Sequence, residues 1–600
     1  MNPSFKRLLQ LLLIPILGLN GFVRAASSPE YSWHTFYGSS TWDYGYALAV
    51  DGSGNIYITG ESGASWNGPA NQPPLQPYTS GDDVFVLKLD ANGSYQWHTF
   101  YGGDDESGEG IAVDENGGVY ICGNSNTSWN GPVGQAPLNP FAGEADMLVL
   151  KLNASGAYQW HAYFGSPAAD DCFDIAAKNG SIAITGVSSI NWNGPSSAAP
   201  LHAVSGYGDM SLVKLNTDGA YQWHTFYSGD AAHTTGLGID IDNVGRIIAV
   251  GETNSSWGLV TVPLHSYTGG KDIFIIQLNN AGILQWHTFF GSAQDDSAND
   301  VITDANNNIL LIGSSDASWE TPNSPVQGFA GGTSDMAVIS LNGNGTYQWH
   351  TFYGSSIFDS GEGIDIDPDG NIIIAGYKDP SPKSGNILPY FGNGEIEVAR
   401  LTHQGAFLDG QLYPTSAFDM AVDDYGNIYL TGDSSHTWDE SNGNKPLHEH
   451  NGSDEVVVIK LKGPQATNIF GDVPAGYWAK NYIETLYANG ITGGCTTSPL
   501  NYCPENPVTR AQMAVFLEKA LHGSNVVPPN IPATFTDTSG HWAEDWIEAL
   551  KNDNITSGCG PEIYCPENSV TRAQMAVFLL KSTHSASYSP PPATGTFSDV

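Results

Sequence analysis

The chain has 600 residues, of which 62 are acidic and 21 are basic, so its formal net charge is -41 at pH 7. This length exceeds that of one ordinary domain. The acidity reflects scarce lysine and arginine, since only 14% of the residues are charged, and it argues against nucleic acid as a partner.

The first 25 residues are predicted to be a signal peptide. Lys6 and Arg7 precede an apolar run over residues 8–23, and the small residue Ala25 follows. A basic segment, an apolar segment and small residues in this order are typical of secretory signals. No other stretch approaches the ~18 to 20 apolar residues that cross a bilayer, so we expect an exported protein without a transmembrane segment.

One phrase recurs at an almost constant spacing through residues 31–462. It reads YSWHTFYG at 31–38 and YQWHTFYG at 95–102, and its six tryptophans are 63 or 64 residues apart. Three further strand-like segments lie between successive copies, joined in several units by D-x-x-G-N sequences that are typical of hairpin turns. A period of this length marks a repeat architecture, and each unit predicts four short strands.

The count of strands indicates a closed ring. The other three strand types occur seven times, whereas the W-H-T-F-Y strand occurs six times clearly and once in a degraded form near residues 406–413. The array begins with the fourth strand of a unit and ends with the third, so the N-terminal strand can complete the last sheet and remove its free edges. We predict a mainly β fold in which residues 31–462 form a seven-bladed β-propeller with N-terminal strand closure, followed by small α-helical domains.

These repeats resemble the bacterial β-propeller repeat family called SBBP. The resemblance covers about seven tenths of the chain, and it implies a propeller fold without naming an activity.

Tryptophans in the long loops between the second and third strands are the candidate ligand face of the propeller. Equivalent loops of a propeller emerge on one face, so these side chains can form a discontinuous aromatic ring that stacks on sugars. The alternative is that each tryptophan folds back as a lid over its own blade. The six are Trp66, Trp129, Trp192, Trp257, Trp319 and Trp438.

We expect no catalytic residues, no metal site and no cofactor in the propeller. The repeated histidine occupies the same strand position in each unit, so the copies are spread around the ring, and packing or hydrogen bonding explains them better than catalysis. Residues that break the repeat form no recognisable nucleophile and base. The D-x-x-G-N turns organise their own backbone, with loosely bound calcium as the alternative.

After residue 464 the composition changes to two copies of a helix-bearing unit. The segments 470–521 and 535–581 match over about fifty residues, and each contains the sequence T-R-A-Q, at 509–512 and 571–574. Apolar residues recur at helical spacing in both copies. The threonine that precedes glutamine by three residues is a capping-box pattern, which predicts the start of a helix.

The two units resemble S-layer homology (SLH) domains, whose F-x-D start, W-A helix, I-T turn and T-R-A helix start they share. We assign the first domain to residues 464–527, the second to 530–588, and the start of a truncated third to 593–600. The resemblance implies non-covalent attachment to an envelope polysaccharide, often a pyruvylated one. A guanidinium beside a helix N-terminus suits a carboxylate-bearing sugar, and the alternative is that each arginine pairs with a neighbouring acid. The implied glycan contacts are Arg510, Arg572, Trp478 and Trp542.

Four of the six cysteines occupy equivalent loops of the two tail units. We predict two local disulfides, Cys495 with Cys503 and Cys559 with Cys565, because an exported protein is oxidised and C-x7-C and C-x5-C without paired histidines are poor zinc spacings. For Cys122 and Cys172, in strands of neighbouring repeats, we expect buried thiols rather than a bridge.

The sequence favours a secreted protein of the cell wall or S-layer that is not an enzyme. Its tail would hold it on envelope polysaccharide while the propeller presents a binding surface for carbohydrate or protein. One alternative is a structural S-layer or envelope component without a specific ligand, and another is a propeller enzyme that acts on polysaccharide.

Overall fold

The computed structural model forms two compact units, one over residues 26–464 and one in the tail from residue 465. Each unit is described by itself. The predicted signal peptide and the predicted start of a third SLH domain lie outside the described residues. The structure describes residues 29–584 except 230–231, 258–260, 379–394, 414, 439–444, 451, 464–469, 474–476, 478, 489, 498–499 and 524–525.

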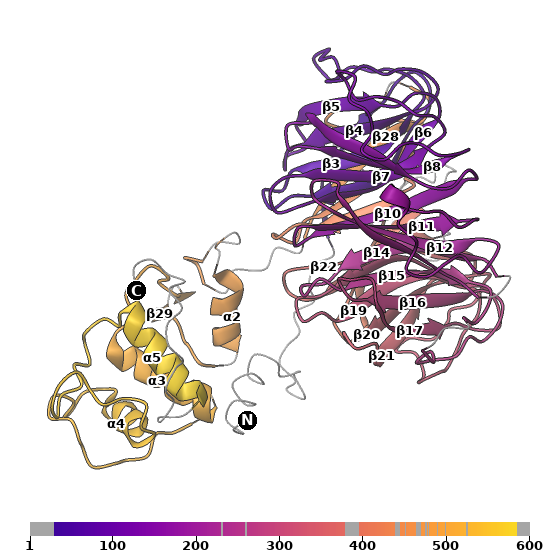
Figure 1. Cartoon of the computed structure of the whole chain (residues 1–600). Coiled ribbons are helices and arrows are strands. Elements are labelled where there is room, and N and C mark those ends of the chain that lie inside the picture. Colours follow the sequence, from indigo (N-terminus) through magenta and orange to yellow (C-terminus); the bar gives the residue numbers. More distant parts are fainter. Residues whose placement is uncertain are drawn as a thin grey trace. The chain divides into compact units, whose positions relative to one another are not determined.

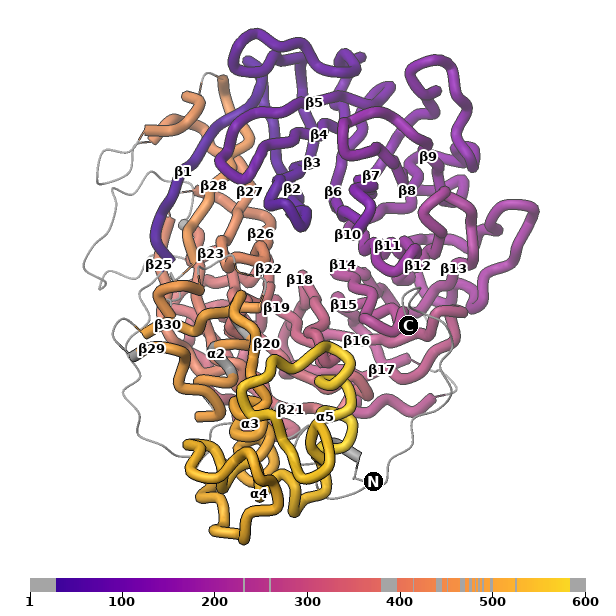
Figure 2. The backbone as a smooth tube through the Cα atoms, turned by 90° about the vertical axis from the view of Figure 1, so that its left-hand side faces the viewer, coloured from indigo at the N-terminus to yellow at the C-terminus, as the bar shows by residue number. Residues whose placement is uncertain are grey.

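The first unit is a ring of seven four-stranded sheets, which confirms the predicted β-propeller (Figure 1). Figure 2 shows the innermost strands of the sheets around a common centre. Blades 1 to 3 are β2 (Asp43–Val50), β3 (Ile56–Ser62), β4 (Asp83–Leu89), β5 (Tyr95–Tyr101); β6 (Glu106–Val113), β7 (Val119–Ser125), β8 (Asp146–Leu152), β9 (Tyr158–Phe164); and β10 (Asp170–Lys178), β11 (Ser181–Ser188), β12 (Asp209–Asn216), β13 (Tyr221–Tyr227), with the short helix η1 (Pro195–Ser197) in a loop.

Blades 4 to 6 repeat the same order. They are β14 (Thr234–Ile241), β15 (Ile247–Thr253), β16 (Asp272–Leu278), β17 (Leu284–Phe290); β18 (Asp296–Thr303), β19 (Ile309–Ser315), β20 (Asp335–Leu341), β21 (Tyr347–Tyr353); and β22 (Asp359–Ile366), β23 (Ile372–Lys378), β24 (Glu395–Leu401), β25 (Phe407–Tyr413).

The seventh blade is closed by the N-terminal strand, as the sequence predicts. Its sheet has the order β1-β28-β27-β26, built from β1 (Glu30–Tyr37), β26 (Asp419–Val422), β27 (Ile428–Ser434) and β28 (Glu455–Lys462). The strand β1 pairs antiparallel with β28, with His34 opposite Ile459. Pairing of the two ends of the repeat array covers the edge of β28 and completes the seventh blade.

Partly buried aspartates of the innermost strands join one blade to the next. An Asp240 oxygen accepts the backbone N–H of Thr303 at 2.8 Å, and an Asp419 oxygen accepts that of Leu48 at the same distance. The second bond crosses from blade 7 to blade 1. The ring is therefore closed by polar contacts at its centre as well as by the outer strand β1.

The glycine that ends the repeated phrase is required by space. A Cβ atom at Gly354 would lie 2.5 Å from Asp335 Oδ1 and 2.8 Å from Asp359 Oδ2. These two aspartates are fully buried and come from neighbouring blades. The interface between blades 3 and 4 differs: Ser228 replaces the glycine, and Thr234 replaces the second aspartate. The hydroxyl oxygens of these two residues are 2.9 Å apart.

Blades 2 and 3 are also linked covalently, which corrects the expectation of two buried thiols. Cys122 on β7 and Cys172 on β10 form a disulfide with a Cα–Cα distance of 6.1 Å. The two strands belong to adjacent blades, and the backbone N–H of Cys172 also donates to the side chain of Asn124 at 2.8 Å. The close packing of neighbouring sheets brings the two sulfur atoms together.

The tail contains two helical units that share a core. The helix α3 begins after Thr509, whose hydroxyl accepts the N–H of Gln512 while the Gln512 side chain accepts the N–H of Thr509, so the predicted capping box is present. Ala514 and Leu517 of α3 pack with Ile547 of the second unit in one hydrophobic cluster. The elements are α2 (Lys480–Ala488), β29 (Thr496–Thr497), β30 (Leu500–Asn501), α3 (Arg510–His522), α4 (Glu544–Asn552) and α5 (Arg572–His584).

Both predicted tail disulfides are present. Cys495 is bonded to Cys503 and Cys559 to Cys565, with Cα–Cα distances of 5.9 and 6.1 Å. Within the described part of the chain, no helix has the length and apolar character needed to cross a membrane.

Candidate functional site

The six loop tryptophans are buried, which corrects the expectation of an exposed sugar-binding ring. Their exposed fractions lie between 4% and 8%. In five blades the indole lies against the histidine of the repeated phrase, as in blade 1, where the Trp66 and His98 ring centres are 3.8 Å apart and the planes differ by 8°. The alternative interpretation, a lid over each blade, is the one that the structure supports. The buried set is Trp66, Trp129, Trp192, Trp257, Trp319 and Trp438.

The repeated histidine holds this lid in place. In blade 1, His98 Nε2 donates to the carbonyl oxygen of Trp66 at 3.0 Å, and the Tyr95 hydroxyl donates to His98 Nδ1 at 2.7 Å. Burial lowers the pKa of His98 to about 4. Both ring nitrogens are occupied and the ring is neutral near pH 7, so the histidine is structural, in agreement with the sequence interpretation.

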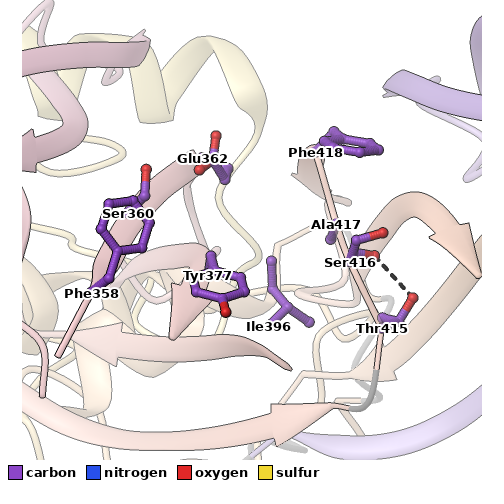
Figure 3. Close-up of a pocket in the computed structure, with 9 residues that line it drawn as sticks. All are labelled: Phe358, Ser360, Glu362, Tyr377, Ile396, Thr415, Ser416, Ala417 and Phe418. Carbon is purple, nitrogen blue, oxygen red and sulfur yellow. Dashed lines mark hydrogen bonds between the residues drawn. The ribbon is translucent and has the colours of Figure 1, made fainter. Parts of the chain in front are cut away.

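A pocket of about 450 Å³ lies between the sixth and seventh blades. Figure 3 shows Phe358, Ser360 and Glu362 on one side of it and Phe418 on the other, with Tyr377 between them. The first three belong to β22 or directly precede it, Tyr377 is on β23, and Phe418 directly precedes β26. The remaining lining residues are Ile396, Thr415, Ser416 and Ala417.

The pocket lies where the seventh repeat is shorter than the sixth. Gly363 pairs with Ala375, the fourth residue of β23, and Asp419 pairs with Thr431, the fourth residue of β27, so Gly363 and Asp419 are equivalent. Residues 354–362 lead from β21 to Gly363, whereas only residues 414–418 lead from β25 to Asp419. The shorter connection leaves less chain to cover this blade interface.

The pocket combines exposed aromatic faces with polar groups. Phe358 and Phe418 are 44% and 40% exposed, so part of each ring is accessible from the pocket. Burial raises the pKa of Glu362, whose carboxylate also accepts from the Asn299 amide at 3.4 Å. Aromatic walls with a few convergent polar groups are typical of sites for small polar ring-shaped ligands.

A second pocket, of about 290 Å³, lies where the two tail units meet, and Arg510 lines it. Arg510 Nε donates to the carbonyl oxygen of Tyr564 at 2.7 Å, and the guanidinium carbon is 4.6 Å from the centre of the Tyr564 ring. The arginine is only 4% exposed, yet its Nη2 has no hydrogen-bond partner among the described residues. The other lining residues are Ile555, Thr556, Ser557, Gly558, Ala573, Gln574, Val577, Phe578 and Lys581.

This second pocket suits an anion. It combines an unpaired guanidinium nitrogen from the first unit with two lining residues from the second, Lys581 and Gln574, whose side chains carry N–H donors. A buried donor without a partner costs free energy, and a ligand oxygen can satisfy it. The chemistry therefore fits a carboxylate or another small oxyanion.

Of the four glycan contacts implied by the sequence resemblance, the described pocket contains Arg510. Arg572, the first residue of α5, is exposed and does not line it. Trp542 is 64% exposed and lies beside His541, with 5.5 Å between the ring centres. Trp478 lies outside the described residues.

Of the residues that line the two pockets, only Arg510 was a candidate from the sequence. Phe358, Glu362 and Phe418 carry no motif, although the shortened seventh repeat marks their place. Gln574 and Lys581 are on α5, and only the packing of the two tail units brings them to Arg510. An alignment of the seven repeats shows the shortened connection beside the first pocket but not the pocket itself, and no simple pattern signals the second.

The chain combines a closed ring of seven blades with two copies of a helical unit in its tail. Residues 33–65 and 96–128 match the beta-propeller repeat family SBBP, and residues 469–514 and 534–576 match the S-layer homology domain family. The chain therefore carries SBBP repeats and two SLH domains, and these findings point to a secreted, cell-surface protein.

Curated relatives are similar to limited parts of the chain. The S-layer protein EA1 of Bacillus anthracis is 30% identical over 129 residues, which are 21% of this chain and 14% of that protein. The cellulosome-anchoring protein of Acetivibrio thermocellus is 27% identical over 138 residues, 21% and 30% of the two chains. An endoglucanase of Bacillus sp. (strain KSM-635) is 32% identical over 113 residues, which are 19% of this chain and 11% of that protein. The chain thus spans less than a third of the length of each of these relatives.

Proposed function

We propose that the protein is held non-covalently on a carboxylate-bearing polysaccharide of the cell envelope by the pocket around Arg510. The observation that carries this proposal is the unpaired Nη2 of a guanidinium that is 4% exposed. Arginine binds carboxylates through paired N–H groups, and such charge-assisted bonds are stronger than neutral ones. Similarity to an S-layer protein and to a cellulosome-anchoring protein supports an envelope ligand.

Sedimentation with purified envelope polysaccharide tests this proposal. Arg510 is buried in the tail core, so the test variant is Gln574→Ala with Lys581→Ala, which removes two lining side chains of α5. Gln574 also accepts the N–H of Thr571 at the start of α5, so the thermal unfolding of the variant is measured alongside. We expect binding to weaken at least about tenfold, a loss of roughly 1.4 kcal/mol. Arg572→Ala, the equivalent arginine outside the pocket, is the matched control and should sediment like the wild type. Unchanged sedimentation of the double variant would show that the pocket is not the anchor.

We also propose that the propeller binds a sugar in the pocket between its sixth and seventh blades. The exposed rings of Phe358 and Phe418 supply apolar faces on which a sugar ring can stack. Glu362, Ser360 and Ser416 supply acceptors and donors for sugar hydroxyls. The propeller would then present carbohydrate-binding capacity at the surface on which the tail holds it.

A glycan array probed with the full chain tests the propeller pocket. The tail variant Gln574→Ala with Lys581→Ala serves as the background, so that signals from the anchor are reduced. Adding Phe418→Ala should abolish the remaining signal, whereas Phe407→Ala, which changes a phenylalanine that is 42% exposed outside the pocket, should leave it unchanged. A signal that survives Phe418→Ala would place carbohydrate binding elsewhere, and no signal in the background protein would favour a protein ligand.

A further inference from the structure

Three metal-ligating side chains meet where the first tail unit packs on the second. Glu518 and His522 are four residues apart on α3, and Asp553 follows α4. Their ligand atoms all lie within 4.8 Å of one another. His522 Nε2 is 2.7 Å from Asp553 Oδ2 and 3.6 Å from Glu518 Oε2. An imidazole nitrogen therefore lies between two carboxylates that come from different units.

Glu518 supplies an independent indication of a ligand at this place. The residue is only 3% exposed, and its Oε1 has no hydrogen-bond partner among the described residues. A buried carboxylate with an unused oxygen is unfavourable by itself, and a bound cation would offset that cost.

The lysines of the two helices are directed elsewhere. Lys519 donates to the carbonyl oxygen of Gly490 at 3.1 Å, and the Lys551 ammonium group lies 5.9 Å from the centre of the Phe535 ring. His522 is thus the basic group that faces both acids in the described contacts. A second group of potential ligands, Asp472 with Cys495 and Cys503, is unsuitable because its sulfur atoms form a disulfide.

We propose that Glu518, His522 and Asp553 bind one zinc ion. One imidazole and two carboxylates are ligands that zinc accepts, and three protein ligands leave a fourth position for water. Calcium and magnesium prefer sites built from oxygen alone. The equivalent positions on α5 are Leu580 and His584, so the first unit carries the site and the second does not repeat it.

A zinc ion at this place would fix the packing of the two units. It would join α3, whose first residue is Arg510, to the end of α4 in the second unit. The same packing forms the pocket around Arg510. The zinc site does not depend on polysaccharide binding, and its test needs no polysaccharide.

Equilibrium dialysis of the full chain against zinc alone, after treatment with a chelator, tests the site. We expect His522→Gln to bind one zinc ion fewer than the wild type, and added zinc to raise the unfolding temperature of the tail in the wild type but not in the variant. His522 is 45% exposed in its side chain, so the variant should fold. The matched control is His541→Gln, since His541 also contacts one carboxylate, Glu567 at 2.7 Å, and it should bind zinc like the wild type.

Equal zinc stoichiometry and affinity in the wild type and His522→Gln would overturn the proposal. An equal loss in His522→Gln and His541→Gln would also overturn it, because that result would indicate general binding by surface histidines. A zinc-induced rise in unfolding temperature that persists in His522→Gln would place the stabilising ion elsewhere.

Discussion

At the scale of single residues, repeated positions in this propeller are set by contacts with the neighbouring strand or blade. The glycine of the repeated phrase leaves room for two buried carboxylates, and its replacement by Ser228 accompanies the loss of one of them at Thr234. The histidine similarly donates a hydrogen bond to the backbone of the tryptophan that covers its own blade, as His98 does to Trp66. Such residues recur because most blades repeat the same packing, and they give no information about a ligand. The outer strand of the sixth blade, β25, has the sequence FLDGQLY and lacks the histidine.

The buried histidines predict a pH-dependent stability that can be traced to one side chain. The pKa of His98 is lowered to about 4 in the folded state, so between pH 4 and 6.5 the unfolded chain binds a proton that the folded chain does not. The stability that neutral His98 contributes is therefore fully present above pH 6.5 and is lost as the pH falls towards 4. The whole change is on the order of 3 kcal/mol.

Urea unfolding of the wild type and His98→Gln at several pH values measures this effect. We expect the difference in unfolding free energy between the two proteins to shrink by about 3 kcal/mol from pH 7 to pH 4. Gln96→Asn, at an exposed neighbour on the same strand, should give a difference that does not change with pH. A constant difference for His98→Gln would mean that the ring takes up its proton normally in the folded protein.

At the scale of elements, β1 is the strand on which the closure of the ring depends. Phe36 on β1 is fully buried in the core of the seventh blade, and Phe100 on β5 is 1% exposed in the first blade. The two phenylalanines hold the same place in the repeated phrase. The N-terminal strand should therefore be packed as firmly as a strand inside the array.

Truncation of either phenylalanine should have a similar cost. Phe36→Ala and Phe100→Ala should each lower the free energy of unfolding by roughly 3–5 kcal/mol, because each leaves a cavity in a well-packed core. Denaturant unfolding followed by tryptophan fluorescence measures both. A cost well below that range for Phe36→Ala alone would show that β1 is detached in solution and that the ring is not closed by it.

At the scale of the whole molecule, the period of the repeated phrase predicted the seven blades, the offset of the array predicted the closure by β1, and the T-R-A-Q sequences predicted the starts of the tail helices. These features follow from local patterns. The pocket beside Glu362 could not be predicted in the same way, because it depends on how a shortened connection leaves an interface uncovered. The Cys122–Cys172 disulfide depends on which strands of adjacent blades face each other.

The place of Arg510 shows the same limit. Its position in the T-R-A-Q sequence made Arg510 a candidate. The residues around it, however, belong to the second unit: Tyr564, which covers the guanidinium, and Gln574 and Lys581, which line the same pocket. The equivalent Arg572 is exposed. The resemblance alone treats the two arginines alike, and the packing distinguishes them.

We infer that anchoring by the tail requires carboxylate groups on the envelope polysaccharide. The most direct measurement is sedimentation of the full chain with purified polysaccharide before and after its carboxylates are converted to neutral amides. We expect amidation to abolish binding of the wild type, because the pocket around Arg510 then has no anion to bind. Equal binding to native and amidated polysaccharide would contradict it.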